Sequence, residues 1–223
     1  MWNHEFALSI LPDLVKAMKL TVSATVVGFL VAVLIGLVLA IARRSRFRVV
    51  QWSTHGFVEF IRNTPLLVQL YFIFYVFPQL GMTLSPFAAG VIGLGIHYGT
   101  YLSEVFRSGI DAIPKGQWEA CRALNFSKGR TWLGVILPQA VPPIIPILGN
   151  YFIVMFKETP LLSAITYVEM LGMAKIIGSE SFRYFEAFTI VGLLFLVLSY
   201  PSSLLFRRLE ERLKQPYLRK NNT

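Results

Sequence analysis

The sequence predicts an all-α polytopic membrane protein with about five transmembrane helices. Hydrophobic residues make up 55 % of the 223 residues, charged residues only 15 %, and the mean hydropathy is +0.59. A soluble domain of this length does not have such a composition. The apolar residues gather in stretches of about 20, which is the length that crosses a bilayer. The basic residues gather between these stretches and at the C-terminus, as membrane topology produces.

The net charge of +9 does not indicate a nucleic-acid-binding protein, because the basic residues follow the ends of the predicted spans. The single cysteine excludes a disulfide framework and a multi-cysteine metal site. The first residues lack a basic region before an apolar core, so we expect no cleaved signal peptide. Residues 1–223 are therefore interpreted as one transmembrane domain.

The first predicted span covers residues 20–42. Small residues recur in it at every fourth position, which makes a smooth stripe on one helix face; they are Ala24, Gly28, Ala32, Gly36 and Ala40. Such a stripe lets another helix approach closely in lipid, so we expect a packing surface, within the chain or against a partner. Arginines at positions 43, 44, 46 and 48 follow. They mark this end as cytoplasmic and place the N-terminus outside.

The second predicted span covers residues 56–80 and has a polar interruption before Pro65. Proline suits the first position of a helix, so we expect a helix to start at Pro65, capped by one of the two residues before it. Glu59 and Arg62 are three residues apart and are expected to pair on one helix face. Two interpretations of this pair stay open: an anchor at the cytoplasmic interface, or a functional role.

The third predicted span covers residues 87–107. The spacing of Gly95 and Gly99 predicts close helix packing rather than a nucleotide-binding loop. His97 lies between them, and no second histidine or cysteine at ligand spacing supports a metal. A buried, hydrogen-bonded histidine is therefore expected. Glu104 is expected to pair with the arginine three residues later.

Residues 111–131 form a polar, basic segment in a chain that is otherwise mostly apolar. The helical spacing of Ala120 and Leu124 predicts a short amphipathic helix, and Ser127 can cap a second one. Two short helices that meet at a bend between spans have a shape that can dock against another protein. An ordinary charged cytoplasmic loop is the alternative.

The fourth predicted span covers residues 132–156 and carries four prolines within nine residues, Pro138, Pro142, Pro143 and Pro146. One regular helix cannot hold them without freeing carbonyl groups. Inside a membrane such breaks survive only where protein or water satisfies the backbone. We therefore expect this segment to line a path or a gate. Lys157 and Glu158 follow, either as a functional pair or as an interfacial salt bridge.

Residues 166–186 mix apolar and charged side chains and predict an external loop or a re-entrant helix, with a partial span possible within residues 160–178. The last predicted span covers residues 187–206. A basic tail follows, with Arg207, Arg208, Arg212, Lys214, Arg219 and Lys220. This pattern gives five spans with the N-terminus outside and the C-terminus in the cytoplasm.

Residues 119–138 resemble the EAA loop found in permease subunits of bacterial ABC importers. The residues that match the family pattern are Glu119, Ala120, Leu137 and Pro138. The departures are Cys121 for the second alanine, Asn125 for glycine and Val135 for isoleucine. Asparagine tolerates a left-handed backbone better than other non-glycine residues, so we expect the turn at Asn125 to be kept.

Other stretches extend the resemblance along nearly the whole chain. Residues 62–70 resemble the R-G-T-P-L-L-V-Q signature of polar amino-acid permeases, with Asn63 in place of glycine. Residues 157–161 resemble the K-D-T-S-L element, with Glu158 for aspartate and Pro160 for serine. The ectoine/hydroxyectoine uptake branch is the most similar one, on the combination of residues 60–65, 116–120, 142–146 and 156–165.

The resemblance implies a type I ABC importer-like transmembrane domain, in which residues 111–131 contain a cytoplasmic coupling helix that sits in a cleft of an ATPase. The residues implied for coupling are Glu119, Ala120, Arg122, Asn125 and Lys128. The residues expected on the substrate path are Glu158, Thr159, Arg62 and Gln69. Glu158 is expected to contact the cationic part of a zwitterionic solute.

The sequence contains no nucleotide-binding loop, zinc-protease motif or nucleophile elbow. We therefore expect no catalytic residue, no metal site and no cofactor on this chain, with ATP and Mg²⁺ on a separate ATPase. The expected partners are an ABC ATPase dimer, a second permease copy or a related permease, a periplasmic or lipid-anchored solute-binding protein, and membrane lipid, but no nucleic acid. The expected location is the bacterial inner membrane.

The expected solute is a polar amino acid or a related zwitterion such as ectoine or hydroxyectoine. A secondary, ion-coupled transporter of small polar solutes is the alternative. Such a transporter would normally have a longer chain with inverted repeats, and this sequence shows no internal repeat.

Overall fold

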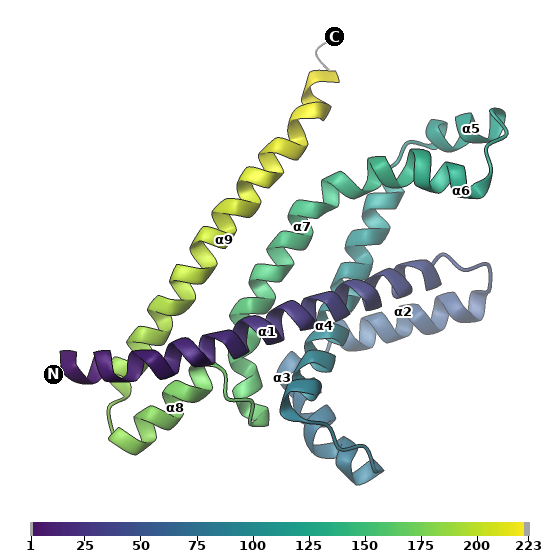
Figure 1. Ribbon diagram of the computed structural model, residues 1–223. Coiled ribbons are helices and arrows are strands. Elements are labelled where there is room, and N and C mark those ends of the chain that lie inside the picture. Colours follow the sequence, from purple (N-terminus) through teal and green to yellow (C-terminus); the bar gives the residue numbers. More distant parts are fainter. Residues whose placement is uncertain (1, 221–223) are drawn as a thin grey trace.

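The computed structural model describes residues 2–220, with side chains described for residues 2–209 and 211, and every regular element in it is helical. Helices α4, α7 and α9 run side by side, and α1 crosses them (Figure 1). The elements in chain order are α1 (His4–Ala42), α2 (Arg48–Arg62), α3 (Leu66–Tyr71), the π-helical turn η1 (Phe72–Val76), the 3₁₀ turn η2 (Phe77–Leu80), α4 (Pro86–Asp111), α5 (Lys115–Ala123), α6 (Lys128–Thr131), the π-helical turn η3 (Trp132–Ile136), α7 (Leu137–Glu158), the 3₁₀ segment η4 (Thr159–Ile165), α8 (Met170–Ser181) and α9 (Tyr184–Lys220).

Helix α1 begins sixteen residues before the predicted span, at His4. The side chain of Asn3 caps it by accepting a hydrogen bond from the amide of Phe6 at 3.1 Å. The added turns carry exposed charged residues, which hid them from a search for apolar runs. Their other face is apolar and buried, and it packs in a core formed with α8 and α9; its α1 residues are Ala7, Ile10, Leu14 and Ala17.

The small-residue stripe of α1 is a packing surface within the chain. This was one of the two expected alternatives, the other being a surface that packs against a partner. Its five members are all buried, and α1 makes its most extensive contact with α4. The glycines of α4 complete the contact. A Cβ atom on Gly95 would lie 2.5 Å from Cγ1 of Val31, and one on Gly99 would lie 2.7 Å from Cγ2 of Ile35. The prediction that Gly95 and Gly99 serve helix packing is confirmed.

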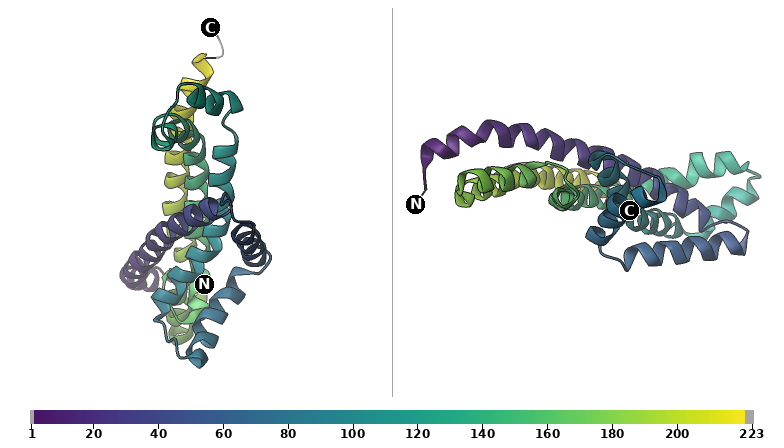
Figure 2. Two further views of the ribbon diagram at one scale, coloured as in Figure 1. Left: turned by 90° about the vertical axis from the view of Figure 1, so that its right-hand side faces the viewer. Right: turned by 90° about the horizontal axis from the view of Figure 1, so that it is seen from below.

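The second predicted span, residues 56–80, is bent at its expected interruption. Helix α2 ends at Arg62, and the helical stretch from Leu66 to Leu80 turns away from it by 104° (Figure 2). Pro65 has extended backbone, with ψ of 138°, and lies just before α3 rather than at its first helical position. The reason is steric, because a proline disfavours helical backbone in the residue before it and cannot donate the hydrogen bond that would continue α2.

The prolines of the fourth predicted span do not break α7. Pro142, Pro143 and Pro146 lie inside the continuous helix Leu137–Glu158, so the expected interruption is wrong at these positions. The irregularity lies instead in the π-helical turn η3, directly before Pro138. A π turn is one of the known ways for a helix to absorb a local mismatch in hydrogen bonding.

Residues 166–186, which we expected to form an external loop or a re-entrant helix, contain the helix α8. Its position relative to a membrane stays a prediction. Glu169 caps the helix and is fully buried, with carboxylate oxygens 3.0 Å from the amide of Leu171 and 2.7 Å from that of Gly172. Thr166, directly after η4, has a left-handed backbone with φ of 64°. This is unusual for a β-branched residue.

By length and composition, three helical stretches within residues 2–220 could cross a membrane, and a fourth if the bent pair is counted as one. The three are His4–Ala42, Lys128–Ile165 and Tyr184–Leu209. Helix α4 coincides with the predicted span 87–107, but it is not among them. It carries charged and polar side chains and lies between other helices, so the count of five remains a prediction. The basic side chains of residues 212–220 lie outside the described side chains.

The contact between α1 and α4 makes a testable prediction about stability. Gly99→Ala should lower the melting temperature of the purified chain, because the new Cβ atom meets the stiff Ile35 side chain, and overpacking of this kind costs about 1–3 kcal/mol. Gly192→Ala in α9 is the matched control, since nothing lies within 4 Å of its Cβ position. Alanine is the better helix former by about 1 kcal/mol, so this control should not melt earlier. Equal melting temperatures for the two variants would contradict the packing role of Gly99.

Candidate functional site

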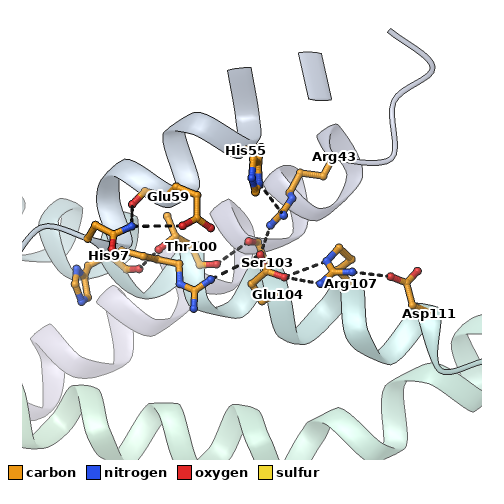
Figure 3. Close-up of polar contacts among 11 residues, drawn as sticks. Arg43, His55, Glu59, His97, Thr100, Ser103, Glu104, Arg107 and Asp111 are labelled. Atoms are coloured by element: carbon orange, nitrogen blue, oxygen red, sulfur yellow. Dashed lines mark hydrogen bonds and ion pairs between the residues drawn. The ribbon is translucent and has the colours of Figure 1, made fainter. Parts of the chain in front are cut away.

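The first candidate region is a line of polar side chains on α4, on a face away from its contact with α1. His97, Tyr101 and Glu104 are spaced by four and three residues and therefore share one face of the helix. Residues from α1, α2 and α3 meet this face. Tyr98, one position further round, meets α7. Figure 3 shows part of this line, from His97 to Asp111.

Gln69 holds the sharp turn between α2 and α3. Its Nε2 donates to the carbonyl oxygens of Ile61 and Thr64 at 2.8 and 3.1 Å, and it lies 2.8 Å from the Thr64 hydroxyl. Its Oε1 lies 3.1 Å from Nδ1 of His97. The carbonyl groups at the end of a helix have no partner within it, and Gln69 provides partners and ties the turn to α4. These contacts show that Gln69 stabilises the turn, and its place on the substrate path stays a prediction.

Glu104 joins arginines that come from three different helices. It pairs with Arg43 at the end of α1 and with Arg107 at 2.9 Å (Figure 3). It pairs more distantly with Arg62 of α2, at 3.8 Å. The expected pair of Glu104 and Arg107 is confirmed. We call Glu104 and these three arginines the Glu104 hub. The hub links α1, α2 and α4 beside the α2–α3 turn, and it therefore stabilises the relative positions of these three helices there.

The expected pair of Glu59 and Arg62 is wrong. The Glu59 carboxylate faces the side-chain amide of Asn63, 3.4 Å away. Arg62 turns instead toward the Glu104 hub and places its guanidinium 5.0 Å from the centre of the Tyr101 ring. Arg62 can contact both the Glu104 carboxylate and the face of the Tyr101 ring in this position. The exposed Glu59 carboxylate, one turn away, would offer a single weak ion pair.

The hub continues toward the end of α4 through a second carboxylate. Asp111 accepts a hydrogen bond from Arg107 at 2.9 Å (Figure 3). It also pairs with Arg44. On the other side, Nη2 of Arg43 lies 3.2 Å from Nδ1 of His55. Arginine side chains therefore outnumber carboxylates in this region, and the surplus is positive.

Glu158 lies at the other side of α4 and does not form the alternative salt bridge with Lys157. Its Oε2 accepts a hydrogen bond from the Tyr98 hydroxyl at 2.6 Å, while Lys157 is exposed. Tyr98 and Tyr101 both contact the ring of Tyr151 of α7, at centroid distances of 6.2 and 6.1 Å. These three tyrosines form an aromatic surface with a carboxylate at one end and the guanidinium of Arg62 at the other.

Thr159 does not share this surface. It is fully buried, and its hydroxyl donates to the carbonyl oxygen of Phe156 at 2.7 Å. Arg62, Gln69 and Glu158 thus converge on α4 through different neighbours, while Thr159 is part of the protein core. Sequence reasoning missed the tyrosines at 98, 101 and 151. The spacing of Tyr98 and Tyr101 beside His97 was the signal that could have found the first two.

The second candidate region is the segment α5–α6, which projects beyond the ends of α4 and α7 (Figure 1). Helix α5 ends in a Schellman motif: the amide of Phe126 donates to the carbonyl of Cys121 at 3.0 Å, and that of Asn125 to the carbonyl of Arg122 at 2.9 Å. Asn125 has φ of 53°, so the expected left-handed turn is confirmed. The expected cap of the second helix is also confirmed, because the Ser127 hydroxyl accepts from the amide of Arg130.

Aromatic contacts hold the two arms of this segment together. Trp118 of α5 packs edge-to-face on Trp132 of η3 at 5.2 Å, and the guanidinium of Arg130 lies 4.4 Å from the Phe126 ring centre. All five residues expected to couple are exposed: Glu119, Ala120, Arg122, Asn125 and Lys128. The bend is therefore rigid, while its outer surface is free to meet another molecule.

Among the side chains described for residues 2–209 and 211, no group of three or more His, Cys, Asp or Glu is placed to hold a metal ion. The arrangement offers charged and aromatic contacts to a solute and an exposed surface to a partner.

Known proteins resemble this chain over most of its length. Residues 32–215 match the family described as binding-protein-dependent transport system inner membrane component. A probable amino-acid ABC transporter permease protein, y4tG of Sinorhizobium fredii (strain NBRC 101917 / NGR234), is 46 % identical over 202 residues, covering 91 % of this chain and 87 % of the relative. The L-cystine transport system permease protein TcyB of Bacillus subtilis (strain 168) is 38 % identical over 204 residues, covering 89 % and 87 %.

A solved structure agrees with the fold. The crystal structure of an amino acid ABC transporter with histidines superposes with a TM-score of 0.88 at 34 % identity, covering 95 % of this chain and 99 % of the other. The MetNI methionine ABC transporter, in an inward-facing conformation, superposes at 0.70 with 16 % identity, covering 95 % and 99 %, and shows the fold alone. The predicted fold class is confirmed. The chain therefore belongs to the family of inner membrane components of binding-protein-dependent transport systems, and its fold is that of an ABC importer transmembrane domain.

Proposed function

We propose that this chain is the permease subunit of an ATP-driven ABC importer for a polar amino acid or a related zwitterion. The observation that carries the proposal is the similarity to an amino acid ABC transporter, with a TM-score of 0.88 and 34 % identity over 95 % of the chain. The names of several relatives, which include amino acids, L-cystine, glutamine and arginine, favour this solute class. A narrower assignment to ectoine or hydroxyectoine rests on sequence resemblance alone.

The partners follow from this proposal. The chain pairs with a second copy or a related permease, receives solute from a periplasmic or lipid-anchored binding protein, and engages an ABC ATPase dimer that carries ATP and Mg²⁺. A secondary transporter, the alternative, would have no use for an ATPase. Copurification of an ATPase with the tagged chain, followed by ATP-dependent uptake in proteoliposomes, separates the two. Uptake that follows an ion gradient without ATP would overturn the proposal.

Residues 111–131 act as the coupling element, with Glu119 at its centre. Two observations support this. Glu119 is exposed, and its carboxylate has no hydrogen-bond or ion-pair partner among the described side chains. The rigid bend at Asn125 holds the exposed side chains of α5 in a fixed orientation, so a force applied to α5 would reach α7 through the contact between Trp118 and Trp132.

Replacing Glu119 with lysine should abolish ATP-driven uptake and leave membrane insertion intact. The substitution reverses a charge on the exposed surface of α5, where no contact within the described chain depends on it. Uptake, ATPase activity and the amount of copurified ATPase are measured together. Lys115→Glu, at the exposed start of α5, is the matched control for a charge reversal, and it should retain more uptake. Normal uptake by Glu119→Lys would show that the coupling element lies elsewhere.

The aromatic surface on α4 and α7 forms part of the solute path. Glu158 at one end suits the ammonium or other cationic part of a zwitterion, and Arg62 at the other suits its carboxylate. The tyrosine faces between them suit a cation or an apolar portion of the solute. Thr159 and Gln69, which the sequence also placed on the path, act indirectly, by holding the backbone that carries Glu158 and Arg62.

Glu158→Gln should weaken uptake roughly ten- to hundredfold. The variant loses the charge-assisted hydrogen bond to the cationic part of the solute, and such a loss costs about 1.5–3 kcal/mol. Glutamine can still accept the hydrogen bond from Tyr98, so the variant removes the charge with little change in geometry. ATPase activity without solute should change little. Transport of labelled amino acids and ectoines is measured in a deletion strain, which also identifies the solute.

Two control variants are compared with Glu158→Gln. Tyr98→Phe removes the hydroxyl that positions Glu158 and keeps the charge, so uptake should fall less than in Glu158→Gln. Lys157→Gln removes an exposed charge next to Glu158 and should have little effect. If Glu158→Gln transports at the normal rate, Glu158 does not contact the solute.

The orientation in the inner membrane follows from the basic residues. The α1–α2 connection, the segment α5–α6 and the C-terminal end of α9 lie toward one end of the molecule, and the N-terminus and α8 toward the other (Figure 1). We assign the first end to the cytoplasm, where arginine and lysine are enriched.

Single cysteines test this orientation in a Cys121→Ser background. Thr83→Cys and Lys175→Cys change exposed positions and should react in whole cells with a thiol reagent that cannot cross the membrane. Lys128→Cys, at the exposed start of α6, should react only after the cells are opened. The reverse labelling pattern would invert the topology.

A further inference from the structure

An open apolar groove lies between the end of α1 and the segment that leads into α7. It encloses about 790 Å³. Leu37 and Ile41 of α1, Val50 of α2, Phe106 and Ile110 of α4, and Trp132 of η3 form its main apolar walls. Ile41 is 71 % exposed, so the groove opens to the outside of the chain rather than into its core.

One arginine lines this groove, and two more follow it closely in the chain. Arg44 lines it and pairs with Asp111, and it keeps about a third of its side chain exposed, at 37 %. Arg46 and Arg48 are exposed and lie in the short stretch between the groove residues Ser45 and Val50. Neither Arg46 nor Arg48 pairs with a carboxylate among the described side chains. Two exposed arginines without a carboxylate partner in the described part of the chain therefore follow the groove residues Arg44 and Ser45.

We propose that this groove binds one anionic glycerophospholipid, with its phosphate at the arginines and an acyl chain along the apolar walls. The apolar walls suit a hydrocarbon chain and the arginines suit a phosphate, and a glycerophospholipid carries both. Exposed apolar surface of this kind is stabilised by a hydrocarbon chain, and arginine side chains bind phosphate through paired N–H groups. A cluster of basic residues just beyond a membrane span attracts anionic lipid.

The position of Trp132 gives the bound lipid a defined neighbour. Trp132 lines the groove and packs on Trp118 of α5. Tryptophan is common where a membrane protein meets the headgroup region. A lipid in the groove would therefore lie against the base of the segment α5–α6, and its acyl chain would be within contact distance of the indole.

Quenching of Trp132 fluorescence by brominated lipid tests the proposal directly. The full chain with Trp2, Trp52 and Trp118 replaced by phenylalanine is placed in nanodiscs that contain dibrominated phosphatidylglycerol or dibrominated phosphatidylcholine. The anionic lipid should quench Trp132 with a relative binding constant about fivefold or more above that of phosphatidylcholine, since each nearby arginine contributes about that factor. The assay needs neither ATP nor solute, so its outcome is independent of the proposed transport function.

A second reporter and two pairs of substitutions make the test specific. Leu196→Trp, in a chain without other tryptophans, reports on an exposed position of α9 (59 % exposed), and it should show no preference between the two lipids. Arg46→Gln with Arg48→Gln should reduce the preference at Trp132 to that level, while Lys16→Gln with Lys19→Gln, on the exposed N-terminal part of α1, should leave it unchanged.

Three results would overturn the proposal, provided that the variants melt like the parent chain. They are equal quenching of Trp132 by both lipids, a preference that survives Arg46→Gln with Arg48→Gln, and no quenching by either lipid. The last result would mean that protein fills the groove, from this chain or from a second copy.

Discussion

The close contact between α1 and α4 is the interaction on which the rest of the structure depends. Lipid offers no hydrophobic force that pushes two apolar helices together, so association depends on how closely they can pack. Here the absence of side chains at Gly95 and Gly99 lets Val31 and Ile35 of α1 reach the backbone of α4. One face of α4 is thereby fixed against α1. The opposite face is then free to carry the polar line from His97 to Glu104, which would be costly on a helix that faced lipid.

The sharp turn between α2 and α3 shows how a side chain can satisfy backbone carbonyl groups where a helix is interrupted in a membrane protein. The carbonyl group of Ile61 lies in the last turn of α2, and that of Thr64 lies just beyond the helix. Water cannot be relied on to hydrogen-bond them inside a membrane. The amide of Gln69 does so and joins the turn to His97 of α4. Arg62, the last residue of α2, is consequently directed toward the Glu104 hub and the Tyr101 ring. The hydrogen-bonded turn between α2 and α3 thus sets the position of the Arg62 guanidinium, which we place on the solute path.

The two candidate regions differ in how they are built, and the difference matches the functions that we propose for them. The aromatic surface on α4 and α7 depends on contacts between residues far apart in the chain, such as Tyr98 with Glu158. The segment α5–α6 depends mostly on local contacts, with a Schellman motif, a serine cap and the contact of Arg130 with Phe126. A locally determined element can keep its shape while the long helices move relative to one another. The contact of Trp118 with Trp132 connects it to the start of α7 and to the apolar groove.

Features that depend on composition or on near neighbours could be predicted from the amino-acid sequence. These include the helical membrane class, the packing stripe of α1, the left-handed turn at Asn125, the cap at Ser127 and the pair of Glu104 with Arg107. Which distant groups meet could be seen only in the packed helices. Arg62 has Glu59 one turn away, yet it turns to Glu104 because that carboxylate already gathers Arg43 and Arg107. Thr159 is adjacent to Glu158, but it points into the core. Local spacing shows which contacts a residue can make, and the competition between near and distant partners is decided only when the helices pack.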